Sequence, residues 1–142
     1  MIEHGADVNA QDTGRKTPLL YASLLESPET AQLLIEHGAE VTAQDQAQNT
    51  PLHVASSIGR EETVKLLLQH GAGVNAHDER HSTPLHLAVS SHLAFDGIVH
   101  LLLSHGANVD EEDSRGQTSF QIASSNGLSE IAKLLSNRLE GE

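Results

Sequence analysis

One stretch of the chain reads Thr50-Pro51-Leu52-His53-Val54-Ala55, and its pattern recurs along most of the 142 residues. Thr-Pro begins at positions 17, 50 and 83, and Thr118-Ser119 takes the fourth position. The tripeptide His-Gly-Ala begins at positions 4, 37, 70 and 105. Both series advance by 33, 33 and 35 residues, so copies of one structural unit explain the chain better than chance composition does.

The second unit predicts two short helices joined by a tight turn. Thr50 can cap the first helix through its hydroxyl, and Pro51 suits the first helical position, where the missing N–H costs nothing. Gly59 offers the left-handed residue that ends this helix. The second helix is expected to begin near Glu61-Glu62, acids that suit the positive end of a helix dipole, and to stop at Gly71.

The polar segment 75–82 has no helical spacing of apolar residues, so we expect a turn or hairpin that joins one unit to the next. Two helices of about ten residues each are marginal in water on their own. Stacking on the next copy buries their apolar faces. The sequence therefore predicts an all-α, one-dimensional array with hairpins along one edge.

The 33-residue period and the Thr-Pro-Leu-His-x-Ala signature identify the chain as similar to the ankyrin repeat family. The resemblance implies one domain, 1–142, with a half-repeat at 1–12 and repeats at 13–45, 46–78, 79–113 and 114–142. Because 1–12 matches only the end of a repeat, we expect a fragment or truncated product. Its first full repeat would present a bare apolar face, through which the chain could self-associate.

The sequence departs from the repeat pattern at three places, and each departure leads to a prediction about local structure. In repeat one Glu26 stands where repeat two has Gly59, so the turn is expected to rely on Ser27-Pro28. Repeat three holds two extra residues within 90–97, where Phe95 either contacts a ligand or folds back over apolar surface. In repeat four the second helix is expected over 129–137, with a frayed tail at 138–142.

Ankyrin repeats bind other proteins through a concave surface of hairpin tips and first helices, and the resemblance implies the same here. Four of the eight basic residues lie at or near hairpin tips, which predicts a partner segment with some acidic character. Carried over position by position, with Phe95 of the insertion added, the surface comprises Lys16, Leu24, Leu25, Gln46, Ala47, Asn49, Ser57, Ile58, Glu79, Arg80, Ser82, Ser90, Ser91, Phe95, Ser114, Arg115, Gln117, Ser125 and Asn126.

The composition limits which classes of partner and which cellular compartment are expected. A formal charge of −12 repels nucleic acid phosphates and anionic membrane surfaces, so neither is an expected partner. The absence of cysteine excludes disulfides and Cys-type zinc sites. No apolar run approaches the roughly 20 residues that span a bilayer, and no signal peptide is recognisable. An intracellular protein, cytoplasmic or nuclear, is the expectation.

Six of the ten histidines occupy repeated positions, and the ten do not form a metal-binding motif. His77 and His81 lie four apart with acids between, but the metalloprotease pattern needs Glu directly after the first His, on a helix. The resemblance implies that His53 and His86 pin a helix start, while the His-Gly-Ala histidines suit helix ends. A histidine-based metal or pH sensor is therefore the weakest alternative, and no metal is expected.

Catalytic motifs are absent from the sequence: it has no nucleophile elbow, no phosphate loop and no His-Glu-x-x-His. We expect a non-enzymatic protein-protein interaction module without a cofactor. The main alternative is a passive spacer or regulatory arm of a larger protein. Asn75 resembles the asparagine that a hydroxylase modifies in ankyrin repeats of animal cells, or it is a hydrogen-bonding hairpin residue.

Overall fold

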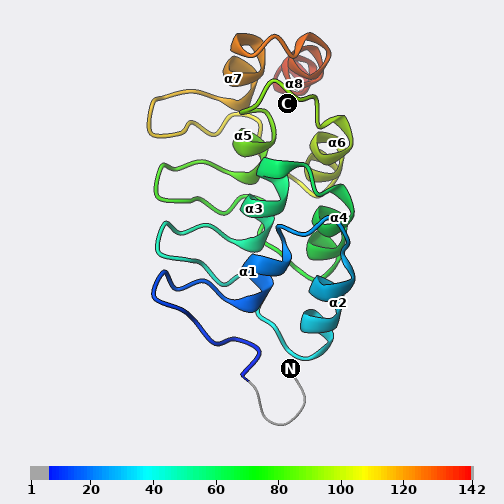
Figure 1. Cartoon of the computed structure of the whole chain (residues 1–142). Helices are drawn as coiled ribbons and strands as arrows, with labels where there is room; N and C mark the ends of the chain where they lie inside the picture. The colour runs from blue at the N-terminus through cyan, green and yellow to red at the C-terminus, as the bar shows by residue number, and fades with distance from the viewer. Residues whose placement is uncertain (1–6, 142) are drawn as a thin grey trace.

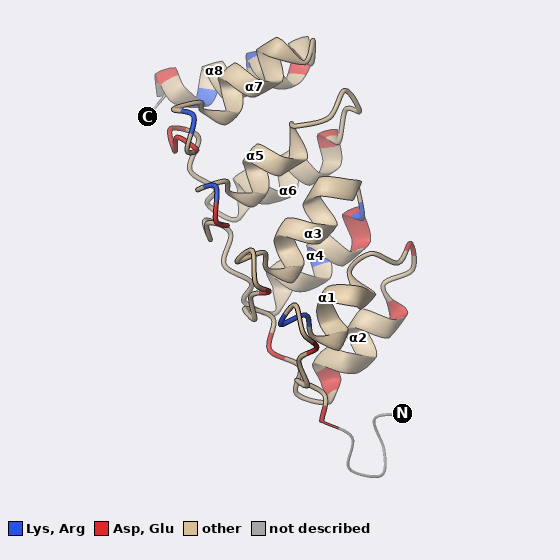
Figure 2. Ribbon diagram, turned by 60° about the vertical axis from the view of Figure 1, so that its left-hand side comes forward, with Lys and Arg blue, Asp and Glu red and all other residues tan. Residues whose placement is uncertain are grey.

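The computed structural model describes residues 7–141, which form helices stacked in pairs, with a hairpin between successive pairs (Figure 1). The helices are α1 Pro18–Ala22, α2 Glu29–Glu36, α3 Pro51–Ile58, α4 Glu61–Gln69, α5 Pro84–Ala88, α6 Asp96–Ser104, α7 Ser119–Ser125 and α8 Ser129–Gly141. Residues 7–141 contain no strand, so the predicted all-α solenoid is confirmed. Figure 2 brings the hairpin edge of the stack forward. The helical turn expected within 1–6 lies outside the described residues.

Each first helix begins at a threonine that caps it, as the sequence predicts. The hydroxyl of Thr50 accepts the backbone N–H of His53 at 3.2 Å, and His53 Nδ1 accepts the backbone N–H of Thr50 at 3.2 Å. This reciprocal capping box satisfies two donors that a helix start would otherwise leave free. Gln121 replaces histidine in repeat four and accepts from Thr118 N–H at 2.9 Å. Leu20 cannot accept a hydrogen bond, so α1 keeps only the threonine half of the box.

The second helices of repeats one to three end at the histidine of His-Gly-Ala. The imidazole Nδ1 of His37, His70 and His105 lies 2.9, 3.0 and 2.9 Å from the carbonyl oxygen four residues earlier. The glycine that follows has a positive φ, 88° at Gly71, which only glycine adopts without strain. These histidines and glycines therefore end helices, as the sequence indicated.

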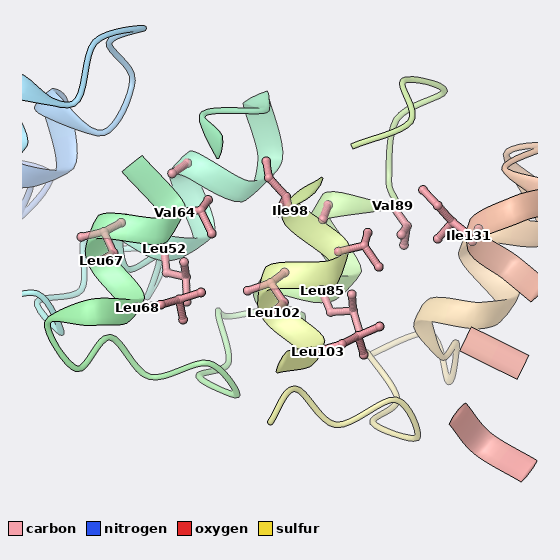
Figure 3. Packing of buried hydrophobic residues seen from close by; sticks show 14 of the residues in the cluster. Leu52, Val64, Leu67, Leu68, Leu85, Val89, Ile98, Leu102, Leu103 and Ile131 are labelled. Atoms are coloured by element: carbon pink, nitrogen blue, oxygen red, sulfur yellow. The ribbon is translucent and has the colours of Figure 1, made fainter. Parts of the chain in front are cut away.

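The core runs without interruption between the two columns of helices. Figure 3 shows Leu52 and Leu67 of repeat two beside Leu85 and Leu102 of repeat three. Residues at equivalent repeat positions are equally buried: Leu67, Leu102 and Leu135 are all 0% exposed. Each repeat thus buries its apolar face on the next one, which is the source of stability in a stacked array.

The last helix differs from the prediction. The sequence suggested a helix over 129–137 and a frayed tail, whereas α8 continues to Gly141. Leu139, one turn beyond the buried Leu135, packs against the core and extends the apolar face of the helix. The expectation of fraying over 138–142 was therefore wrong for 138–141, and Glu142 lies outside the described residues. No helix within 7–141 combines the length and the apolar character that crossing a membrane requires.

The insertion of repeat three folds back on repeat two. The Phe95 ring covers Gly59, where an added Cβ would lie 2.6 Å from Phe95 Cε1. Phe95 is half-buried and packs against the hydrophobic core. On the other side, Asn126 Nδ2 of repeat four donates to the carbonyl of Val89 at 2.7 Å. Phe95 therefore packs over apolar surface, as one of the two alternatives expected, and its contact with a ligand stays a prediction.

Candidate protein-binding site

One aspartate organises each hairpin tip. Asp78 Oδ1 accepts the backbone N–H groups of Arg80 and Ser82, both at 2.9 Å, and Asp12, Asp45 and Asp113 bind their own tips in the same way. A residue with left-handed φ completes each turn: Arg15, Gln48, His81 and Gly116. The turn directs the intervening side chains toward solvent.

Backbone hydrogen bonds join neighbouring tips. Gln46 N–H donates to Gly14 O at 2.8 Å, Glu79 N–H to Ala47 O at 3.0 Å, and Ser114 N–H to Arg80 O at 2.8 Å. One such bond per neighbouring pair holds the four tips in register. We call the surface made by these tips and the exposed sides of α1, α3, α5 and α7 the hairpin face.

Buried histidines tie the first helices to the following hairpins. His53 Nε2 lies 2.9 Å from the carbonyl oxygen of Ser82, and His86 Nε2 lies 3.0 Å from that of Gln117. Burial lowers the pKa of His53 below its ordinary value, because the charged ring loses solvation, although the Ser82 carbonyl and Asp78 act in the opposite direction. The repeat histidines are structural groups, as the sequence implied.

A groove of about 480 Å³ lies on the hairpin face between repeats three and four. We call it the repeat 3–4 groove. Eight of its eleven lining residues belong to the surface predicted from sequence, so the fold brings these together. The lining comprises Arg80, Ser82, Leu87, Ser90, Asp113, Ser114, Arg115, Gln117, Ile122, Ser125 and Asn126.

Sequence reasoning missed three residues of this lining: Leu87, Asp113 and Ile122. Leu87 and Ile122 occupy the variable position of Leu-His-x-Ala, three residues before Ser90 and Ser125. Helical residues three apart share a face, so this spacing could have placed them beside the predicted serines. They give the groove apolar lining between polar rims.

Two arginines and one aspartate give the lining a formal balance of +1 on a protein of −12. Arg80 and Arg115 are exposed, and within residues 7–141 neither guanidinium makes a hydrogen bond or an ion pair. Asp113 is half-buried and its Oδ1 is occupied by two backbone N–H groups. Figure 2 shows basic and acidic segments alternating along the hairpin tips.

The remaining predicted residues lie outside this groove or contribute little to it. Ser82 is only 8% exposed, so its predicted place on an open surface is corrected: it borders the groove but mainly serves the turn. Ser91 is half-buried, and its hydroxyl accepts the Leu93 N–H at 3.2 Å. Outside the groove lie Lys16, Leu24, Leu25, Gln46, Ala47, Asn49, Ser57, Ile58 and Glu79.

His77 forms a contact between neighbouring hairpins. Its Nε2 lies 2.9 Å from Glu111 Oε1, and this partner holds the pKa of the Glu111 carboxyl below its usual value. The His81 ring lies 5.3 Å from the His77 ring, centroid to centroid. Within residues 7–141 no three His, Cys, Asp or Glu side chains gather as a metal site would require.

Asn75 is a hydrogen-bonding residue of the hairpin. Its Nδ2 donates to Gly106 O at 3.1 Å, and its Oδ1 accepts the Asn108 N–H at 2.8 Å. Asn9 makes the same two bonds to the next repeat, at Gly38 and Glu40. Hydroxylation at Asn75 stays a prediction.

Stacked helix pairs joined by linked hairpins define a helical repeat protein. A family model described as ankyrin repeats (3 copies) matches residues 44–113 and 72–141, and one described as ankyrin repeats (many copies) matches 19–68. The chain belongs to the ankyrin repeat family. Ankyrin repeats generally mediate protein-protein interaction and are typically non-enzymatic. No curated protein matches the chain.

Proposed function

We propose that the chain is a non-enzymatic protein-binding module whose partner lies on the hairpin face, with the repeat 3–4 groove as the main contact. The observation that supports this proposal most is that the two arginines of the groove have no intramolecular partner in the part of the chain that the structure describes. Arg80 and Arg115 border apolar lining from Leu87 and Ile122 without any intramolecular partner within residues 7–141. Exposed arginines around an apolar centre are the composition that protein interfaces favour.

The polar groups that serve the fold form a separate set. Histidines of the signature and aspartates of the tips are engaged within the array, at 2.9 to 3.2 Å for His53 and 2.9 Å for Asp78. A partner can bind the groove without breaking these bonds. The repeated residues thus support the stack, and the residues that vary between repeats are left to recognise a partner.

Affinity capture with the whole chain from an extract of its source cell tests the proposal. The test variant is Arg80→Glu with Arg115→Glu, and the control is Lys65→Glu with Lys133→Glu, which reverses two exposed charges on α4 and α8. Both pairs of substitutions change the formal charge equally, so a general charge effect would alter the capture of proteins by both variants to the same extent.

Wild type and control are expected to retain the same proteins, and the groove variant is expected to retain them at least tenfold less. Circular dichroism on all three chains shows whether the folds match. A passive spacer predicts no difference between any of these chains, and equal retention by wild type and groove variant would overturn the proposal.

A further inference from the structure

The ends of the first helices change character along the array. Tyr21, Leu24, Leu25 and Ile58 of repeats one and two are 49%, 46%, 47% and 37% exposed. Repeats three and four carry Ser90, Ser91, Ser125 and Asn126 at the positions equivalent to Leu24 and Leu25. At these positions the side chains therefore become more polar along the array, with Ser57 and Ile58 in repeat two, although Leu87 and Ile122 keep apolar lining in the repeat 3–4 groove.

One position of the hairpin tips changes in the opposite sense. The position held by Gly14 and Ala47 in the first two tips is held by Arg80 and Arg115 in the last two. In the first half the Lys16 Nζ lies 3.4 Å from Asp45 Oδ2, whereas Arg15 of the same tip is exposed and its guanidinium has no partner within residues 7–141. Arg80 and Arg115, whose guanidinium groups have no partner within residues 7–141, thus lie in the repeats that follow the exposed apolar side chains of repeats one and two.

We infer that the partner on the hairpin face is an extended protein segment in two parts, with apolar side chains over repeats one and two and carboxylates over repeats three and four. This inference rests on the proposed function and specifies the partner's chemistry. Arginine guanidinium groups bind carboxylates in pairs of hydrogen bonds, while Tyr21, Leu24, Leu25 and Ile58 gain by removing apolar surface from water.

The geometry of the stack sets the length of the segment. Neighbouring packed helices lie about 10 Å apart, so four repeats extend about 30 Å from first to last. An extended chain advances about 3.3 Å per residue, which gives a segment of about nine residues. The charge of −12 repels carboxylates from most of the protein outside the hairpin tips. Of the two basic ends of the hairpin face, the first also exposes Leu24 and Leu25, which favours the apolar part of the segment there.

A display library of random peptides long enough to cross the array, selected on the immobilised whole chain, provides the test. We expect enriched peptides to carry Asp or Glu at one end and large apolar residues at the other. The consensus peptide is then synthesised, and its Kd is measured by titration calorimetry with each variant.

Two variants address the two halves. Arg80→Glu with Arg115→Glu removes the carboxylate contacts, and Leu24→Ser with Leu25→Ser gives repeat one the serines that repeat three carries. Each is expected to raise the Kd at least tenfold, and Lys65→Glu with Lys133→Glu is expected to leave it within twofold. A consensus peptide with lysines in place of its acids should recover binding to the charge-reversed chain.

The outcomes separate the two claims. Enriched peptides without acidic residues, or with a Kd that neither variant changes, would overturn the two-part partner and leave the proposed function standing. A library that yields no enriched peptide would also overturn the extended segment, because the hairpin face would then bind no segment of this length, and the proposed function would still be decided by the affinity capture.

Discussion

His53 Nε2 lies 2.9 Å from the carbonyl oxygen of Ser82, 29 positions further along the chain. The other ring nitrogen, Nδ1, accepts the backbone N–H of Thr50 at 3.2 Å. An acceptor at Nδ1 and a donor at Nε2 define one neutral tautomer. One fully buried ring thus caps α3 and holds the next hairpin, so the histidine of the signature connects repeats as well as starting a helix.

Replacing this ring by alanine should destabilise the chain strongly. His53→Ala leaves the Thr50 N–H and the Ser82 carbonyl without their partner in the interior, and each loss costs about 1–3 kcal/mol. His53→Gln keeps the capping acceptor, as Gln121 does in repeat four, and should lose less. Urea unfolding followed by circular dichroism measures both. Equal losses for the two variants would contradict the capping role.

Acid should weaken the fold through the same ring. Because burial lowers the pKa of folded His53, the unfolded chain takes up a proton first as pH falls below the ordinary histidine value of about 6.5. The free energy of unfolding should therefore decline from that pH down to the lowered folded pKa, and be constant above it as far as His53 is concerned. The lowered Glu111 pKa acts in the same direction, but only below the ordinary carboxyl value.

His53→Gln provides the control for this pH dependence. The variant lacks the titrating group and keeps the other nine histidines, so the difference between the two unfolding curves isolates His53. We expect the decline below about pH 6.5 to be shallower in the variant. Parallel curves for variant and wild type would show that His53 is not the responsible group.

Helix starts and stops could be predicted because their causes are local. Thr50 caps the N-terminus of α3, Pro51 occupies its first position and Gly59 ends it, so each acts within a few residues of its own place in the sequence. Contacts between repeats could not be predicted in this way. Nothing adjacent to Phe95 in sequence indicates that its ring meets Gly59, 36 positions earlier, because that contact depends on how the repeats stack.

The candidate site was predictable in part for the same reason. Family positions located most of the groove lining, since repeat position determines which side chains reach the hairpin face. Leu87 and Ile122 were missed because the positions carried over from the family covered the hairpin tips and the ends of the first helices, and did not include the variable position of Leu-His-x-Ala. Ser82 was misjudged because position in the repeat does not show that it is 8% exposed or that His53 of the neighbouring repeat binds its carbonyl oxygen.

A buried hydroxyl in repeat two offers a stabilising substitution. Thr63 is 1% exposed, and its Oγ1 has no hydrogen-bond partner within residues 7–141. The equivalent positions hold Ile98 and Ile131, both buried and apolar. Thr63→Val should therefore raise the free energy of unfolding by about 1 kcal/mol. Thr42→Val, at an exposed site, should change it by less than about 0.5 kcal/mol. A destabilised Thr63→Val chain would indicate a partner for the hydroxyl.

Asn75 should stabilise the junction of repeats two and three. Asn75→Thr introduces the residue that stands at the equivalent Thr42, whose side chain makes no hydrogen bond within residues 7–141. Two hydrogen bonds to repeat three are lost, so we expect about 1–2 kcal/mol less stability in urea unfolding. The exposed Asn108→Ala variant serves as the control, with a change below about 0.5 kcal/mol. Equal effects of both would contradict the junction role.

Gly59→Ala should destabilise the chain for two separable reasons, the backbone conformation of Gly59 and the position of the Phe95 ring. Its φ is 82°, which costs an L-residue about 1 kcal/mol or more. Gly71 has a φ of 88° but nothing within 4 Å of an added Cβ, so Gly71→Ala measures the backbone cost alone. Gly59→Ala should cost about 1–3 kcal/mol more than that, because its Cβ would overlap Phe95.

Phe95→Ala separates the two contributions to the Gly59 cost. With the ring removed, adding Gly59→Ala should destabilise the chain only as much as Gly71→Ala destabilises the wild type. Urea unfolding of the four chains in this double-mutant cycle gives the coupling between the two positions, which we expect to exceed about 0.5 kcal/mol. Additive effects would mean that the ring does not lie on Gly59. The insertion of repeat three would then be free of repeat two, and the Phe95 ring would be available to contact a ligand.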